Sequence, residues 1–234
     1  SLVHRVLELV WQRLKSHQQL LTLTDEALQG LVEHAVAEAI DEIALRYPQT
    51  VTRRFRQMES ERLCTQVLEW LALEKQREPF TMLESEGQYE VSAGVRVKLK
   101  IDRIDALADG RKVVIDYKTG EVKPAQWFGE RPDEPQLPLY SMTVEGPIAG
   151  IVFGQLRAGN MAFSGVAEEA DLLPEVKSFE KLKKLTNEAD SWAQVLEQWQ
   201  VTMEQLGQAF RDGEATVDPK NYPGSCSYCE LKLL

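Results

Sequence analysis

The run from Lys112 to Lys118 constrains the fold of this chain more than any other segment. Residues 113–115 are all apolar, so both faces of this stretch are apolar, as in an inner strand that is buried on both sides. Side chains two apart on a strand point to the same face, so Asp116 and Lys118 project together while Tyr117 projects the other way. A charged pair at the end of a buried strand is costly unless something compensates it. The run therefore predicts an inner strand that ends in a functional site.

A second strand precedes this run. Over residues 95–101 apolar and basic side chains alternate, which is typical of a half-buried strand, and Asp109-Gly110 then marks a turn. In the hairpin that results, Asp102 can supply a second carboxylate next to Asp116. Carboxylates bind Mg²⁺ or Mn²⁺, and the Lys118 ammonium can stabilise developing charge or help to activate water. A surface salt bridge also explains many isolated Asp-x-Lys pairs, so the partner strand and Asp102 are what favour phosphodiester hydrolysis.

The rest of the chain predicts helices around this sheet. Apolar residues recur every three or four positions over residues 3–14, 28–43 and about 58–76, with a stop near Pro48 and another at Pro79. A weak strand is expected around residues 89–91, a short helix over 134–142, and a second hairpin from strands 148–156 and 161–166. Helices are expected from about 179 to 210, with Gly213 as a C-terminal stop.

This order predicts an α/β fold with a mixed central sheet flanked by helices and with extra N- and C-terminal helices. We expect one domain over residues 1–234, with a helical segment at 1–78, the catalytic sheet region at 80–167, and C-terminal helices with a cysteine tail at 177–234. Because the chain begins within a helical pattern and stops just after a Cys-x-x-Cys, we expect a domain excised from the C-terminus of a longer protein.

Composition excludes several classes of protein. The chain has no run of about 18 apolar residues, which a membrane-spanning helix would need, and no signal-peptide pattern opens it. Three cysteines are too few and too unevenly spaced for a disulfide framework, which favours the cytoplasm. The net charge of −10 argues weakly against non-specific wrapping of nucleic acid but does not exclude a local basic groove.

Three short motifs resemble the signature of the PD-(D/E)XK nuclease superfamily in its RecB/AddB-like branch. They are Asp102-Arg103-Ile104-Asp105, Asp116-Tyr117-Lys118-Thr119-Gly120 and Gln136-Leu137-Pro138-Leu139-Tyr140. The resemblance runs from His4 to the final cysteines and implies a restriction-endonuclease-like core. Leu99 departs from it, because relatives often have glycine three residues before the first Asp.

The resemblance also implies roles for single residues. Asp102 and Asp116 would bind the metal together with the backbone carbonyl of Tyr117, and Lys118 would be catalytic. Gln136 and Tyr140 would flank the site and position DNA, and because they are four apart they would share one helix face. His4 matches a metal-binding histidine on an early helix, although from the residues alone it would be a boundary residue. Glu86 stands where relatives often carry an acidic residue, and we expect it to be solvated.

The remaining candidates are weaker. Cys226 and Cys229 resemble the tail of relatives that hold a [4Fe–4S] cluster, so a cluster is expected only in the full-length protein; zinc or plain packing are the alternatives. We expect Cys64 to be buried, and His17 and His34 to be surface or packing residues. Trp127 and Phe128 follow the active-site strand and either stack on unpaired bases or anchor their loop to the core.

Together these patterns predict a Mg²⁺-dependent deoxyribonuclease, and in particular an exonuclease of bacterial DNA repair and recombination. It would act on DNA within a helicase-like protein or with an ATPase partner subunit. The alternative is a catalytically silent, nuclease-derived domain that binds DNA or a partner protein. Loss of a carboxylate or of the lysine would indicate that alternative, and Asp102, Asp116 and Lys118 are all present.

Overall fold

The N-terminal part of the chain is helical, as its apolar periodicity predicts. The computed structural model describes residues 1–220 and 222–227, and its first four helices are α1 (Leu2–Leu14), α2 (His17–Thr22), α3 (Asp25–Arg46) and α4 (Arg53–Glu74). Each begins at a Ser or Thr whose hydroxyl accepts a hydrogen bond from the third backbone N–H of the helix. The cap at Thr52 explains why α4 begins five residues before the predicted start.

The strands form one mixed sheet of six, in the order β1-β2-β3-β4-β5-β6. They are β1 (Phe80–Ala93), β2 (Val95–Leu107), β3 (Lys112–Lys118), β4 (Ile148–Arg157), β5 (Asn160–Ala167) and β6 (Lys177–Ser178). The pairs β3–β4 and β5–β6 are parallel, and the other neighbours are antiparallel. The predicted α/β fold with a mixed sheet is confirmed, and the weak strand expected at 89–91 is part of the long strand β1.

The connections and the C-terminal region contain shorter elements. They are the 3₁₀ turns η1 (Pro124–Trp127), η2 (Phe179–Leu182) and η3 (Gly224–Cys226), and the helices α5 (Gln136–Ser141) and α6 (Trp192–Arg211). The prediction of helices throughout 179–210 is wrong over residues 183–191. Asn187 and Glu188 there have positive φ, which interrupts a helix, and Ser191 then caps α6. Gly213 follows α6 with a φ of 76°, as a C-terminal stop should.

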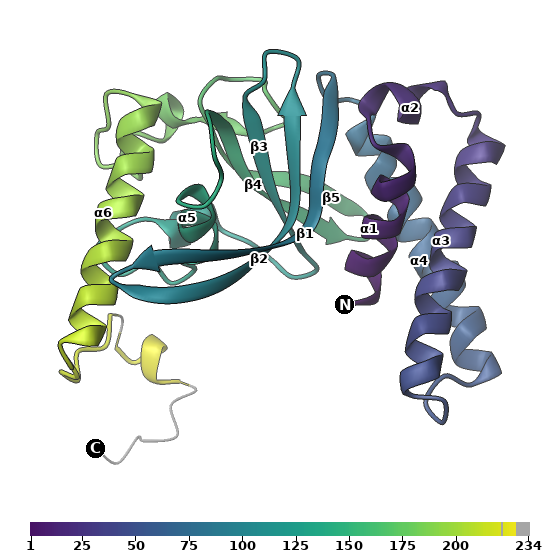
Figure 1. Ribbon diagram of the computed structural model, residues 1–234, viewed down its shortest axis with the longest axis horizontal. Coiled ribbons are helices and arrows are strands. Elements are labelled where there is room, and N and C mark those ends of the chain that lie inside the picture. The colour runs from purple at the N-terminus through teal and green to yellow at the C-terminus, as the bar shows by residue number, and fades with distance from the viewer. Residues whose placement is uncertain (221, 228–234) are drawn as a thin grey trace.

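The inner strand β3 separates two apolar layers. Val113, Ile115 and Tyr117 pack with the core formed by α1, α3 and α4, whereas Val114 packs with α5 and α6 on the opposite face. Figure 1 shows the N-terminal helices on one side of the sheet, and α5 and α6 on the other. Because side chains alternate along a strand, Asp116 lies on the α5 side, as Val114 does. Within residues 1–220 and 222–227, none of the helices has the length and apolar character that a bilayer crossing requires.

The tip of the β1–β2 hairpin contacts α6 through glycine (Figure 1). A Cβ on Gly207 would lie 1.6 Å from the backbone oxygen of Ala93. We expect Gly207→Ala to lower the free energy of unfolding by about 2 to 3 kcal/mol, because a backbone atom cannot yield as a flexible side chain can. Gly30 is the control: it lies in α3 with nothing within 4 Å of an added Cβ, so Gly30→Ala should raise stability by about 0.5 to 1 kcal/mol. Urea denaturation measures both, and equal stability of the two variants would contradict this contact.

Candidate active site

The candidate site lies at the end of the inner strand. β2 and β3 pair antiparallel with Arg103 opposite Ile115, so the next residues outward, Asp102 and Asp116, are neighbours across the strands. The backbone N–H of Tyr117 donates to Oδ2 of Asp102 over 2.8 Å. The sequence-based expectation that Asp102 stands beside Asp116 therefore agrees with the observed register.

Asp116 is almost fully buried and is surrounded by residues of β3 and α5. Lys118 Nζ lies 2.9 Å from Asp116 Oδ2, and Gln136 Nε2 donates to Asp116 Oδ1 over 3.0 Å. Gln136 also accepts from Lys118 Nζ over 2.9 Å and donates to the Tyr140 hydroxyl. That hydroxyl lies 3.3 Å from Asp116 Oδ1 and contacts the carbonyl oxygen of Lys100. The four predicted side chains on β3 and α5 thus form one hydrogen-bonded group.

Burial perturbs both carboxyl groups. The pKa of Asp102 is raised from 3.8 to about 6, mainly by desolvation, although the Tyr117 hydrogen bond acts in the opposite direction. The pKa of Asp116 is also raised from 3.8 to about 6, first by desolvation and then by the charge of Asp102, and Lys118 offsets part of this rise. Two carboxylates that repel each other in a buried place favour a bound cation.

Two further ionisable residues border Asp102. His4 of α1 places Nδ1 3.7 Å from Asp102 Oδ2, and burial lowers its pKa, which favours the neutral imidazole that can bind a metal. Glu86 is not solvated, contrary to the prediction: its side chain is only 15% exposed, pairs with Lys100, and its charge raises the pKa of Asp102. Glu86 stands across from Asp102 through the strand register, since Ser85 is opposite Arg103 and Gly87 is opposite Ile101. Its backbone has a φ of 58°.

The donor atoms at this site are of the kinds that bind a divalent cation, but they do not lie close enough together to hold one. Asp116 Oδ2 is buried, and no donor in the described part of the chain makes a hydrogen bond of good geometry with it, despite the close Lys118 ammonium. This oxygen, the Asp102 carboxylate and a neutral His4 nitrogen are the ligand types that Mg²⁺ and Mn²⁺ accept. Yet in residues 1–220 and 222–227 no three His, Cys, Asp or Glu side chains are close enough together to hold an ion as they stand. Because the Lys118 ammonium lies 2.9 Å from Asp116 Oδ2, a cation that bound to this oxygen would compete with it.

The raised carboxyl pKa values have a consequence for stability without metal. A carboxyl whose pKa rises from 3.8 to about 6 on folding contributes full stability below pH 4, and loses it as the pH rises to 6. Asp102→Asn removes this penalty, so at pH 8 with EDTA it should raise the free energy of unfolding by up to about 3 kcal/mol. The gain should shrink as the pH is lowered toward 4, and Mg²⁺ should stabilise wild type more than the variant. Urea denaturation at several pH values tests this, and a variant that is less stable at pH 8 would contradict it.

Below the site, a buried network of charges joins β2 and β3 to α4. Arg103 donates to both oxygens of Asp105 over 2.7 and 2.8 Å, to Glu74 over 2.7 Å and to the Tyr117 hydroxyl over 3.0 Å. Arg77 donates to Glu74 over 2.7 Å and to Asp105 over 2.8 Å. The network carries two positive and two negative charges, and all four charged side chains are at most 1% exposed. It fixes Tyr117, whose backbone N–H holds Asp102.

Sequence reasoning did not find this network. In the sequence Arg103 and Asp105 stand out only as parts of a motif, and nothing distinguishes Glu74 or Arg77. The one available signal was the position of Arg103 and Asp105 on the face of β2 opposite to Asp102, which is the core face.

The other candidates lie apart from the site or outside the described residues. Trp127 is fully buried, and its ring packs 4.9 Å from that of Phe153, so it anchors its loop to the core. Cys64 is half-buried on α4, not buried as predicted. Cys226 is half-buried on η3 and forms no disulfide with another cysteine of the described residues, whereas Cys229 lies outside them. His17 packs against Phe80, whereas His34 is exposed.

The comparison with protein families covers almost the whole chain. A family model described as the PD-(D/E)XK nuclease superfamily matches residues 1–233. A search of curated proteins gave no match.

Proposed function

Because the chain belongs to the PD-(D/E)XK nuclease superfamily, we propose that it is a metal-dependent nuclease that hydrolyses phosphodiester bonds of DNA. The observation that carries the proposal is the pairing of two buried carboxyl groups, each with a pKa of about 6, beside the Lys118 ammonium. An arrangement with perturbed carboxyl groups and a nearby cation is frequent at catalytic sites and unfavourable elsewhere.

We assign the metal to Asp102, Asp116 and His4, with the backbone carbonyl of Tyr117 as a further ligand, and Mg²⁺ or Mn²⁺ as the ion. When bound, the ion would supply positive charge to the scissile phosphate and would acidify water. The Tyr117 N–H holds Asp102 in place, and Gln136 holds both Asp116 and Lys118. Tyr140 fixes Gln136 from the same helix.

Lys118 has the central role among the side chains of the chain. Its ammonium lies 2.9 Å from Asp116. When a bound cation neutralises the charge of that carboxylate, the ammonium can turn to the phosphate. There it would neutralise the charge that develops on the phosphoryl oxygens, or position the attacking water. Gln136 Oε1 accepts a hydrogen bond from the ammonium and so limits the directions in which it can move.

The biological setting is a further part of the proposal. By resemblance to the RecB/AddB-like branch, the domain would act as an exonuclease in cytoplasmic DNA repair and recombination, next to a helicase-like region or an ATPase subunit. The acidic net charge of −10 supports this, because much of the affinity for DNA would then come from such a partner.

The experiment that tests the proposed activity is incubation of the chain with linear single- and double-stranded DNA in the presence of Mg²⁺ or Mn²⁺. Degradation that EDTA abolishes is the expected result, and comparing end-labelled with circular DNA distinguishes an exonuclease from an endonuclease. DNA binding without any cleavage in either metal, even with saturating protein, would favour the silent, nuclease-derived domain instead. Absence of both binding and cleavage would contradict the proposal.

A further inference from the structure

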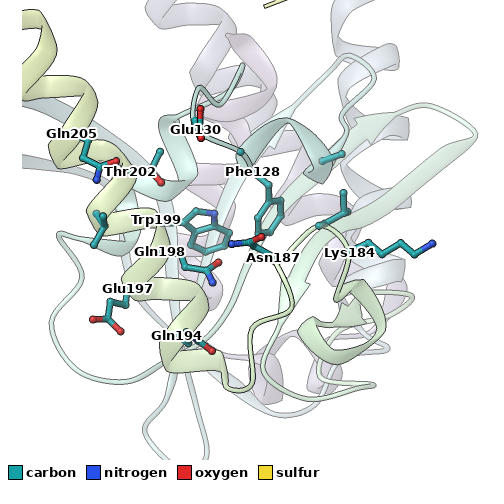
Figure 2. Close-up of a pocket in the computed structure, with 14 residues that line it drawn as sticks. Phe128, Glu130, Lys184, Asn187, Gln194, Glu197, Gln198, Trp199, Thr202 and Gln205 are labelled. Carbon is teal, nitrogen blue, oxygen red and sulfur yellow. The ribbon is translucent and has the colours of Figure 1, made fainter.

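A pocket of about 680 Å³ lies between α6 and the segment that follows β3 (Figure 2). This volume is within the usual range for small-molecule sites. Trp199 of α6 and Phe128 lie side by side in the pocket, with ring centroids 5.3 Å apart. Phe128 is only half-buried, so part of its ring is available to a ligand. Trp199 is only 3% exposed, so the aromatic surface that the pocket offers to a ligand comes mainly from Phe128, with Trp199 packed behind it.

Amide side chains surround the two rings. Asn187, Gln194, Gln198 and Gln205 all line the pocket together with Phe128 and Trp199 (Figure 2). Among the hydrogen bonds of residues 1–220 and 222–227, none engages the side chain of Asn187, Gln198 or Gln205. Neutral donors and acceptors are thus free around an aromatic surface.

The charged residues that line the pocket indicate which part of a nucleotide it would bind. Glu130 and Glu197 contribute two carboxylates, and Lys184 is the one cationic side chain among the residues that line it. This balance disfavours a phosphate, which binds to cationic groups. A nucleobase is neutral, stacks on aromatic rings and presents both donors and acceptors at its edge. Aromatic and amide side chains complement those properties.

The pocket is connected to the candidate active site. Phe128 lies in the segment 119–135, which joins Lys118 to Gln136. Trp199 packs 6.3 Å from Trp127, Trp127 packs 4.9 Å from Phe153, and the Lys118 ammonium lies 5.5 Å from the Phe153 ring. Two buried aromatic rings, those of Trp127 and Phe153, therefore lie in line between the pocket and the residue to which we assign catalysis.

From these contacts we infer that the pocket between Phe128 and α6 binds one unpaired base of the DNA strand that is cleaved. This inference rests on the proposed function and names how the substrate is held. The base must be unpaired, because in a duplex its edge is paired and its faces are stacked. The two roles that the sequence leaves open for Trp127 and Phe128 are then divided between them: Trp127 anchors the loop, and Phe128 contacts the base.

The test compares two single strands of about 12 nucleotides, one of oligothymidylate and one abasic strand of the same length. Fluorescence anisotropy measures their affinities for the Lys118→Ala protein in Mg²⁺, so that the strands are bound but not cut. We expect the oligothymidylate to bind about 10-fold more tightly, as one stacked base would provide. Adding Phe128→Ala or Gln198→Ala should abolish most of this preference and leave the affinity for the abasic strand unchanged. Phe210→Ala is the matched control, because Phe210 is 77% exposed on the same helix and does not line the pocket.

The outcomes separate this inference from the proposed function. If wild type cleaves DNA but the preference for bases is absent, or survives both pocket variants, the inference is overturned and the nuclease stands. A preference that falls equally with Phe210→Ala would also overturn it, because the effect would not be specific to the pocket. If the protein neither binds nor cleaves DNA, both are overturned.

Discussion

Replacing Lys118 with alanine should lower the turnover number for DNA cleavage by about 100- to 10,000-fold, which is the range for removal of a positioned catalytic group. Lys118 is the only described cation within hydrogen-bond distance of Asp116, and it is 31% exposed, so a substrate can reach it. Removing the ammonium should leave metal binding intact or slightly stronger, because it no longer competes for Asp116 Oδ2. Single-turnover cleavage and a metal titration on the same variant test both statements.

The matched control is Lys112→Ala. Lys112 lies at the other end of the same strand, where its Nζ donates to the carbonyl oxygen of Glu145. Cleavage by this variant should remain within about three-fold of wild type, since a surface substitution away from the site changes little. Equal activity of Lys118→Ala and wild type would show that the ammonium has only a structural role.

Replacing Arg103 with alanine should lower the free energy of unfolding by about 3 to 5 kcal/mol, because Glu74 and Asp105 would remain buried without most of their compensation. Arg103 is 1% exposed, and its guanidinium also lies 3.7 Å from the centre of the Trp11 ring. Such a loss is a large part of the 5 to 15 kcal/mol that stabilises a typical domain. Urea denaturation at pH 7 measures it.

Arg96→Ala is the control for that experiment. Arg96 lies on the same strand but is 83% exposed, and it pairs with Glu90 at 3.4 Å. Its loss should change stability by less than about 0.5 kcal/mol. A change of under about 1 kcal/mol for Arg103→Ala would mean that the buried network does not join α4 to the sheet as described.

Local patterns were sufficient to predict the inner strand and its partner. Residues 113–115 are apolar on both faces, and the alternation over 95–101 has a period of two, so β2, β3 and the turn at Asp109-Gly110 follow from neighbouring residues. The same reasoning brought Asp102 next to Asp116, and the spacing of four placed Gln136 and Tyr140 on one face of α5. These features depend on short distances along the chain.

Features that depend on distant residues could not be predicted in this way. Glu74 and Arg103 are 29 positions apart, and nothing in either segment shows that they form an ion pair. Glu86 stands across from Asp102 through the β1–β2 register, which includes a bulge between Met82 and Glu84, and its positive φ is one that a glutamate rarely adopts. The pocket between Phe128 and Trp199 likewise joins segments about 70 residues apart, although each aromatic residue was visible in the sequence.

The measurement that tests the central claim most directly is a calorimetric titration of Mn²⁺ into wild type and into Asp116→Asn at pH 8. The claim is that the two buried carboxylates hold the catalytic cation. We expect wild type to bind Mn²⁺ and the variant to bind at least about 10-fold more weakly. Binding by wild type should also weaken below pH 6, because protons compete for carboxyl groups whose pKa is about 6. Equal binding by both proteins, or no binding by wild type, would contradict the claim.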